Sequence, residues 1–162
     1  GWPSSGHRII SNGCPWIDHF MQLNDYAGVV ESEVIPGRHN GCTVFLALAN
    51  GAEFVMRLTE IGTPRIGVRD YIETSLGSRT AVIRDAQHYR AEDASRTLRK
   101  KRVEVLDAYR EMYRTICRRA LAGEPGDTPN PLQSSRITIE LDRQLQEILR
   151  GRRASTVSDA GQ

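Results

Sequence analysis

Two close pairs of cysteine and histidine lie in the first third of the chain. Cys14 and His19 are five residues apart, and His39 and Cys42 are three apart in a turn that contains glycine. Tetrahedral zinc takes thiolate and imidazole ligands of this kind, and a structural zinc site has four of them. One hypothesis is therefore a small zinc-stabilised binding module, in which Cys14, His19, His39 and Cys42 hold the loop-rich N-terminal third together. The alternative is that Cys42 is an unreactive buried thiol, because free cysteine is among the most buried residue types.

Cys42 also fits a second kind of chemistry, as a nucleophile. A catalytic thiol needs a lowered pKa, which a helix N-terminus supplies, and a histidine base. The stretch 40–48 (NGCTVFLAL) locally resembles the nucleophile segment of ovarian-tumour-type proteases, members of the papain-like cysteine proteases, in which the cysteine begins a helix. The resemblance implies a cysteine hydrolase with Cys42 as nucleophile and His88, which precedes Tyr89, as base. It departs from that family in lacking the acidic residue before the glycine and the asparagine after it.

The backbone around Cys42 has two interpretations. Asn50-Gly51 separates the apolar runs 43–49 and 52–58, and this dipeptide is a strong hairpin signal because a two-residue type I′ turn needs positive φ at both central positions. Such a turn would place Phe45 opposite Met56. The alternative is a helix over 42–49 that Gly51 ends. We favour the hairpin, and the cysteine-hydrolase hypothesis requires the helix.

Residues 90–121 contain no glycine or proline and place apolar side chains at helical spacing, which predicts one long amphipathic helix ended by Gly123. This segment has ten Lys and Arg against five Asp and Glu, a net +5, whereas the whole chain has +2. Basic side chains bind nucleic-acid phosphates through counterion release. The candidates for such contacts are Arg96, Lys100, Lys101, Arg110 and Arg114. The alternative is a solvated face on which Asp107 and Glu111 pair with the arginines.

The apolar side of the same predicted helix suggests a protein contact. Tyr109, Met112 and Tyr113 lie on or beside it, and Arg102 falls within it. Protein interfaces are enriched in Tyr, Met and Arg. We therefore expect a homo-oligomer whose interface includes Arg102, Tyr109, Met112 and Tyr113.

The expected fold class is α+β, with a small, mostly antiparallel sheet packed on the helix over 90–121 in a single domain, 1–122. Residues 123–135 are rich in Pro, Gly and Ser and predict a linker. The alternating segment 136–141 predicts a strand, and a short helix follows it, so that 136–150 forms a strand–helix arm. Residues 151–162 predict a flexible polar tail.

Composition limits the function classes. A chain of 162 residues with 39% hydrophobic side chains can bury one core, and no run reaches the ~18 apolar residues that a membrane span needs. Three cysteines favour free thiols in an intracellular, reducing compartment, although a cleaved signal peptide would leave no trace in this sequence. No glycine-rich phosphate loop predicts a nucleotide site. The sequence thus predicts a non-catalytic interaction or assembly protein, a helix-mediated oligomer whose basic helix face contacts nucleic-acid phosphates, with no cofactor unless zinc binds.

Overall fold

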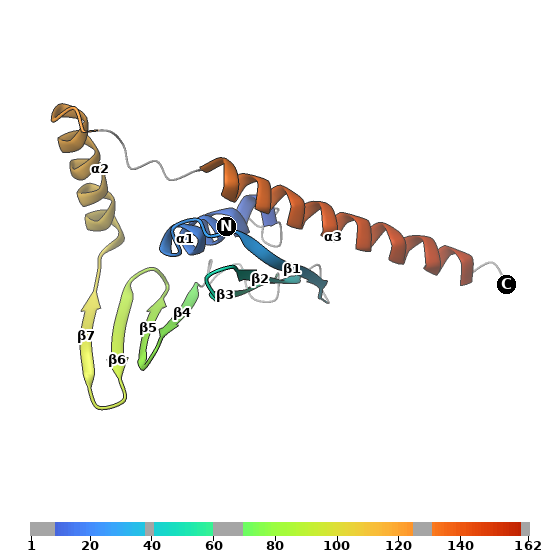
Figure 1. Cartoon of the computed structure of the whole chain (residues 1–162), viewed down its shortest axis with the longest axis horizontal. Coiled ribbons are helices and arrows are strands. Elements are labelled where there is room, and N and C mark those ends of the chain that lie inside the picture. Colours follow the sequence, from blue (N-terminus) through green and yellow to red (C-terminus); the bar gives the residue numbers. More distant parts are fainter. Residues whose placement is uncertain (1–8, 38–40, 60–69, 125–130, 160–162) are drawn as a thin grey trace. The chain divides into compact units, whose positions relative to one another are not determined.

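The computed structural model describes residues 9–37, 41–59, 70–124 and 131–159 (Figure 1). Within them the chain forms two antiparallel sheets, three α-helices and one short π-helix, which confirms the α+β class. The chain divides into two compact units, one made of Gly1–Gly62 with Thr128–Gln162 and the other of Thr63–Asp127. These boundaries differ from the domain 1–122 expected from composition, because the C-terminal helix belongs with the N-terminal unit.

The first unit is a three-stranded sheet covered on one face by helices. Its strands run in the order β1 (Val29–Pro36), β2 (Cys42–Leu48) and β3 (Glu53–Leu58). Side chains of β2 alternate between buried and half-buried positions, so a single face of this sheet points into the core. The covering elements are η1 (Ile9–Gly13), α1 (Cys14–Leu23) and α3 (Pro131–Asp159).

The core of this unit joins segments from both ends of the chain. Pro15 lies in the first turn of α1, where its fixed φ suits the helix, and the helix then buries Ile17 and Met21 one turn apart. The rings of Phe20 and Phe54 stack with centroids 4.9 Å apart and tie α1 to β3. The buried apolar side chains are Ile9, Ile17, Met21, Val34, Cys42, Val44, Leu46, Leu48, Met56, Leu141 and Leu145.

The predicted hairpin at Asn50-Gly51 is confirmed, but its turn is one residue longer than expected. Leu46 lies opposite Phe54, and the amide of Leu48 donates to the carbonyl of Ala52 at 2.9 Å, which leaves a three-residue loop. Gly51 has φ +83°, the left-handed conformation that such loops use at their last position. The predicted pairing of Phe45 with Met56 is therefore wrong, and Phe45 lies opposite Val55 on the open face of the sheet.

The second unit is a four-stranded antiparallel meander followed by a helix. The strands are β4 (Tyr71–Leu76), β5 (Arg79–Arg84), β6 (His88–Asp93) and β7 (Thr97–Arg102), paired in sequence order. The helix α2 spans Val105–Leu121. The prediction of one helix over 90–121 is thus correct only for its second half.

The first half of that predicted helix is a strand, a turn and a second strand. Asp93 makes the turn, because its Oδ1 accepts hydrogen bonds from the amides of Ser95 at 2.8 Å and Arg96 at 2.9 Å. The Ser95 hydroxyl, which donates to the same oxygen at 2.7 Å, and these amides lower the pKa of the Asp93 carboxyl. An aspartate that bonds the backbone two residues later favours a turn over a helix. Hydrogen bonding to β5 holds residues 88–93 in the extended conformation of β6, and hydrogen bonding to β6 holds residues 97–102 in that of β7.

The predicted strand at 136–141 is also wrong, because these residues lie inside α3. Buried side chains occur at Ser134, Thr138, Leu141 and Leu145, which is the spacing of one helical face. The hydroxyl of Thr138 donates to the Ser134 carbonyl at 2.8 Å, one helical turn back. Packing of this face on the core outweighs the strand preference of the alternating sequence. Residues 151–159, predicted as a tail, continue the helix, and residues 125–130 of the predicted linker lie outside the described residues.

Candidate interaction surfaces

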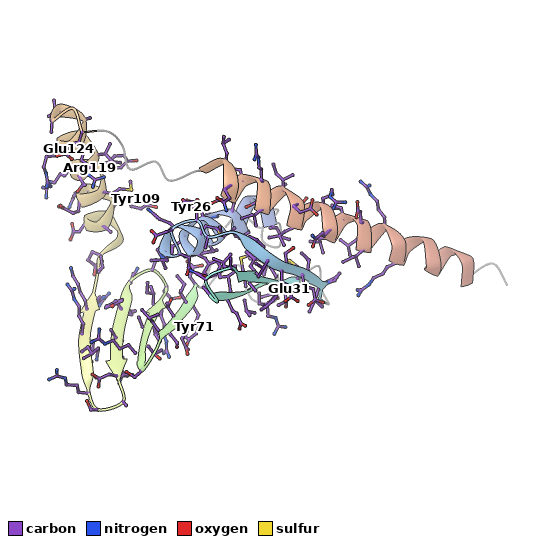
Figure 2. The ribbon with its side chains drawn as sticks, viewed as in Figure 1. Tyr26, Glu31, Tyr71, Tyr109, Arg119 and Glu124 are labelled. Atoms are coloured by element: carbon purple, nitrogen blue, oxygen red, sulfur yellow. The ribbon has the colours of Figure 1, made fainter. Side chains whose placement is uncertain are left out.

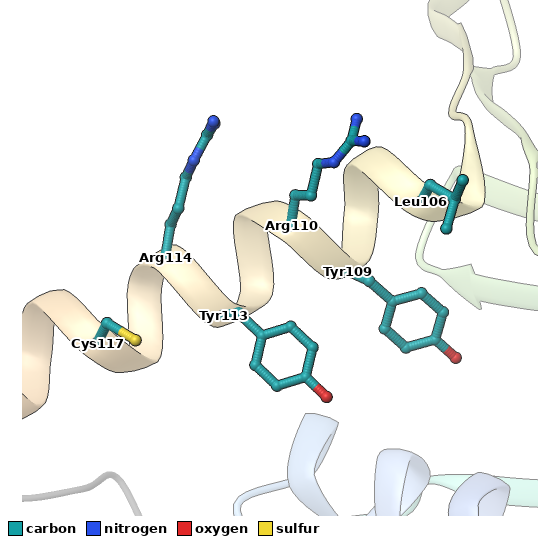
Figure 3. A pocket seen from close by; sticks show the side chains of 6 residues that line it. All are labelled: Leu106, Tyr109, Arg110, Tyr113, Arg114 and Cys117. Atoms are coloured by element: carbon teal, nitrogen blue, oxygen red, sulfur yellow. The ribbon is translucent and has the colours of Figure 1, made fainter.

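One side of α2 exposes a row of large apolar side chains, which we call the α2 stripe: Leu106, Tyr109, Met112, Tyr113 and Ile116. Their exposed fractions run from 44% for Met112 to 70% for Leu106. Figure 3 shows the rings of Tyr109 and Tyr113 on the same side of the helix, with the guanidinium groups of Arg110 and Arg114 directed away from them. Within the described residues of the second unit, no layer covers the α2 stripe.

The polar side of α2 carries cations that already have acidic neighbours. Arg110 lies 3.0 Å from Asp107, and Glu111 lies 3.7 Å from Arg114 and 3.8 Å from Arg118. Exposed pairs of this kind contribute little to stability. They do reduce the net charge that this side of the helix offers to a phosphate.

One face of the second unit's sheet carries a row of aromatic and basic side chains across its four strands. Tyr71, Arg84, His88 and Arg102 occupy directly opposed positions on the four strands, so their side chains point to the same side. The next row on that side contains Arg90 and Lys100, which are also directly opposed. We call Arg84, His88, Arg90, Lys100 and Arg102 the cationic face. All five residues are exposed.

Tyr71 lies at the edge of the cationic face, on β4 (Figure 2). The guanidinium carbon of Arg84 is 5.6 Å from the centre of the Tyr71 ring, within the range of a cation–π contact. The Tyr71 hydroxyl donates to Glu73 at 2.6 Å, and this bond is the main reason that the pKa of Tyr71 is raised. The contact with Arg84 acts in the opposite direction on that pKa.

The five residues predicted to contact nucleic acid lie in different places within the second unit. Lys100 is on the cationic face, whereas Lys101 lies opposite Tyr89 and points to the other face of the sheet. Arg96 is in the turn between β6 and β7, and Arg110 and Arg114 are on α2. Sequence reasoning missed Arg84, His88 and Arg90 as members of a basic surface. Only the strand register shows that these three side chains share one face of the sheet. The alternation of residue types in 79–84 and 88–93 is the sequence signal for strands there.

The four residues predicted to form the homo-oligomer interface also lie on two different elements. Tyr109, Met112 and Tyr113 belong to the α2 stripe. Arg102, which we placed on the apolar side of a helix, is the last residue of β7 and lies 3.5 Å from Glu104. Its expected position among helical apolar residues is wrong because the helix begins only at Val105.

Cys42 occupies a buried position in the middle of the first unit's core. It begins β2 and has 2% of its surface exposed. Burial, reinforced by the nearby carboxylate of Asp142, raises the pKa of the Cys42 thiol to about 11. The helix that the nucleophile hypothesis required is absent at Cys42, and His88 belongs to the other compact unit. A protonated, buried thiol is the opposite of an activated nucleophile.

The zinc hypothesis depends on a residue outside the described ones, His39. Of its other proposed ligands, Cys14 is half-buried at the start of α1, His19 is exposed on α1, and Cys42 is buried in β2. Within the described ranges, no three His, Cys, Asp or Glu side chains come together to hold a metal ion.

No described helix is both long enough and apolar enough to cross a membrane. Comparison with protein-family models, with curated proteins and with solved structures finds no match to this chain.

Proposed function

We propose that this chain is a non-catalytic assembly protein that forms homo-oligomers through the α2 stripe. The observation that carries the proposal is the exposure of five large apolar side chains on one side of a single helix, from 44% to 70%. Contiguous apolar surface of this kind marks interaction sites in proteins. Tyrosine and methionine are also residues that interfaces favour.

A helix of this length needs a packing partner. Helices shorter than roughly 12–15 residues are marginal in water, and most helical stability in proteins comes from burial of an amphipathic face. At 17 residues α2 is only slightly longer, and the residues flanking it in the described second unit leave its stripe open. Burial of each large side chain of the stripe would contribute about 1.5–3 kcal/mol.

A second copy of α2, running antiparallel, suits the dipole of the helix. The side chains of Asp107, Glu111 and Arg118 lie on the polar side of α2, away from the stripe, and stay outside such an interface. An antiparallel pair opposes the two helix dipoles. It is also self-complementary, as a two-fold interface must be.

Sedimentation velocity over a range of protein concentrations tests the proposal. We expect a concentration-dependent oligomer for the unmodified chain and a monomer for the double variant Tyr109→Glu with Ile116→Glu. Leu121→Glu is the matched control, because Leu121 is 90% exposed on the same helix but lies off the stripe. A monomer at every concentration, or equal dissociation by both variants, would contradict the proposal.

A cysteine hydrolase that uses Cys42 and His88 is the alternative from a different class. Burial and the raised pKa of Cys42 favour the assembly role over this alternative. The three cysteines are free thiols, which favours a reducing compartment for either function.

A further inference from the structure

We propose that the cationic face of the β4–β7 sheet binds single-stranded nucleic acid, with phosphates on its Arg and Lys side chains and a base on Tyr71. This site is distinct from the α2 stripe, and the inference does not depend on self-association. It also differs from the basic helix surface that the sequence predicts, because four of its five residues are not among those predicted to contact nucleic acid.

The strand register builds the site. Tyr71, Arg84, His88 and Arg102 form an uninterrupted row across all four strands. Directly opposed side chains lie about 4.5–5.5 Å apart, so a polyanion crossing the strands meets one side chain after another. Arg90 and Lys100 form the same arrangement one row further along. Six side chains able to bind phosphate or stack on a base therefore share one surface.

The charge on this face is only partly neutralised. Its acidic members are Glu73, which accepts a hydrogen bond from Tyr71, and Glu92, which pairs with Arg90 and accepts from Thr97. Four Arg and Lys residues against these two glutamates give +2 with His88 neutral, and Glu104, which lies 3.5 Å from Arg102, reduces the net charge to +1. Among the described residues, no carboxylate lies within ion-pair distance of Arg84 or Lys100.

The opposite face of the same sheet has a different character. Ile72, Ile83 and Tyr89 are directly opposed there, next to Lys101. These three side chains are half-buried, whereas the five residues of the cationic face are exposed. The opposite face also carries Arg79, Arg99 and Lys101, with Asp93 directly opposite Arg79, so net charge does not distinguish the two faces. The cationic face differs in its row of exposed basic side chains across neighbouring strands, because half-buried apolar side chains occupy the matching row on the other face.

The width of the row, and the tyrosine at its end, favour single-stranded over double-stranded nucleic acid as the ligand. Four strands at a spacing of about 4.8 Å make a row roughly 14 Å wide between the outer backbones, which exceeds the ~12 Å major groove that admits one helix or a two-stranded ribbon. Tyr71 is 59% exposed, and the Arg84 guanidinium lies 5.6 Å from its ring centre. Aromatic and guanidinium groups beside a basic track are the elements of single-strand binding surfaces, where each stacked base contributes about 1–3 kcal/mol by alanine substitution.

Fluorescence anisotropy with a labelled oligo(dT) of about 20 nucleotides tests the site in the full chain at low salt. The test variant is Lys100→Glu with Arg102→Glu. The matched control is Arg99→Glu with Lys101→Glu, which changes the same strand by the same charge but on the opposite face. We expect the test variant to bind at least about tenfold more weakly and the control to change affinity by less than about threefold, because only the first removes direct phosphate contacts.

Equal loss in both variants would overturn the proposal, because it would show an effect of net charge alone. Absence of oligo(dT) binding by the unmodified chain would also overturn it, as would binding to phosphatidylserine vesicles without binding to oligo(dT). Circular dichroism of each variant confirms that the exposed substitutions leave the fold intact.

The aromatic contact has its own test. Tyr71→Ala should weaken oligo(dT) binding by about fivefold or more, and Tyr71→Phe should keep most of it because the ring remains. Equal affinities for the three forms would overturn the stacking contact. We expect the variant Tyr109→Glu with Ile116→Glu to be monomeric. In that background, replacing Lys100 and Arg102 should still weaken oligo(dT) binding more than replacing Arg99 and Lys101. The two proposals can therefore fail independently of each other.

Discussion

Lys100 and Lys101 are consecutive residues of β7, and their side chains lie on opposite faces of the four-stranded sheet. Lys100 lies opposite Arg90, whereas Lys101 lies opposite Tyr89. On a helix the two lysines would be separated by only about 100° and would share one basic surface. The strand places the two lysines on different faces, and the row of exposed basic side chains on the face of Lys100 is the basis of the nucleic-acid proposal.

Cys42 should react slowly with thiol reagents in the folded protein. In a variant with Cys14→Ser and Cys117→Ser, only Cys42 remains, and its pKa, raised from 9.0 to about 11, lowers the thiolate fraction at neutral pH about a hundredfold. Labelling by Ellman's reagent should be slow at neutral pH and fast in denaturant. Rapid labelling of the folded chain would instead support the cysteine hydrolase. Cys117, which is exposed, provides the comparison when it alone is retained.

Gly51→Ala should destabilise the hairpin through the backbone alone. Gly51 has φ +83°, and a Cβ built there would meet no atom within 4 Å. We expect a loss of about 1 kcal/mol in the free energy of unfolding, measured with urea. Gly28→Ala is the control, because a Cβ at Gly28 also meets no atom within 4 Å but its φ lies outside the left-handed range. If both variants lose stability equally, the left-handed turn is not the cause.

Leu46→Ala should be far more costly than Val55→Ala. Both residues lie on the hairpin, but Leu46 is fully buried and Val55 is 68% exposed on the other face of the sheet. Truncation of a buried leucine costs about 2–5 kcal/mol through lost burial and the cavity it leaves. The exposed valine should change stability by less than about 0.5 kcal/mol. Similar losses in urea unfolding would contradict the assigned register.

The Glu140 carboxyl should titrate well below its ordinary range. Arg143 donates to both of its oxygens, at 2.6 Å and 2.9 Å, and with Gln144 lowers the pKa of Glu140 from 4.5 to about 2. A lowered folded-state pKa means that the interaction stabilises α3 above about pH 4.5 and is lost as the pH falls toward 2. An NMR pH titration of the Glu140 side chain measures this pKa.

Arg143→Gln should return the Glu140 pKa most of the way to its ordinary value. Arg150→Gln is the control on the same helix, because no contact joins Arg150 to Glu140 among the described interactions. Titration of Glu140 near pH 4.5 in the unmodified chain would contradict the arrangement of these side chains. Such a result would also weaken the assignment of residues 136–141 to a helix.

The elements predicted correctly from the sequence are those with local signals. Asn50-Gly51 predicts a turn between two strands. Gly123, with φ +66°, ends the helix of Tyr109 and Tyr113 as its residue type indicates. In each case the residues that decide the conformation lie within a few positions of one another, so the sequence alone contains the necessary information.

The tertiary structure decided the elements that depend on distant partners. Residues 97–102 are a strand because β6 pairs with them, and 136–141 are helical because Leu141 and Leu145 pack on a core assembled from the N-terminal strands and helices. The shared face of Arg84, His88 and Arg102 follows from register, which a one-residue shift would reverse. Local sequence sets the preference of each segment, but hydrogen bonding and burial against residues far away in the chain select the conformation that forms.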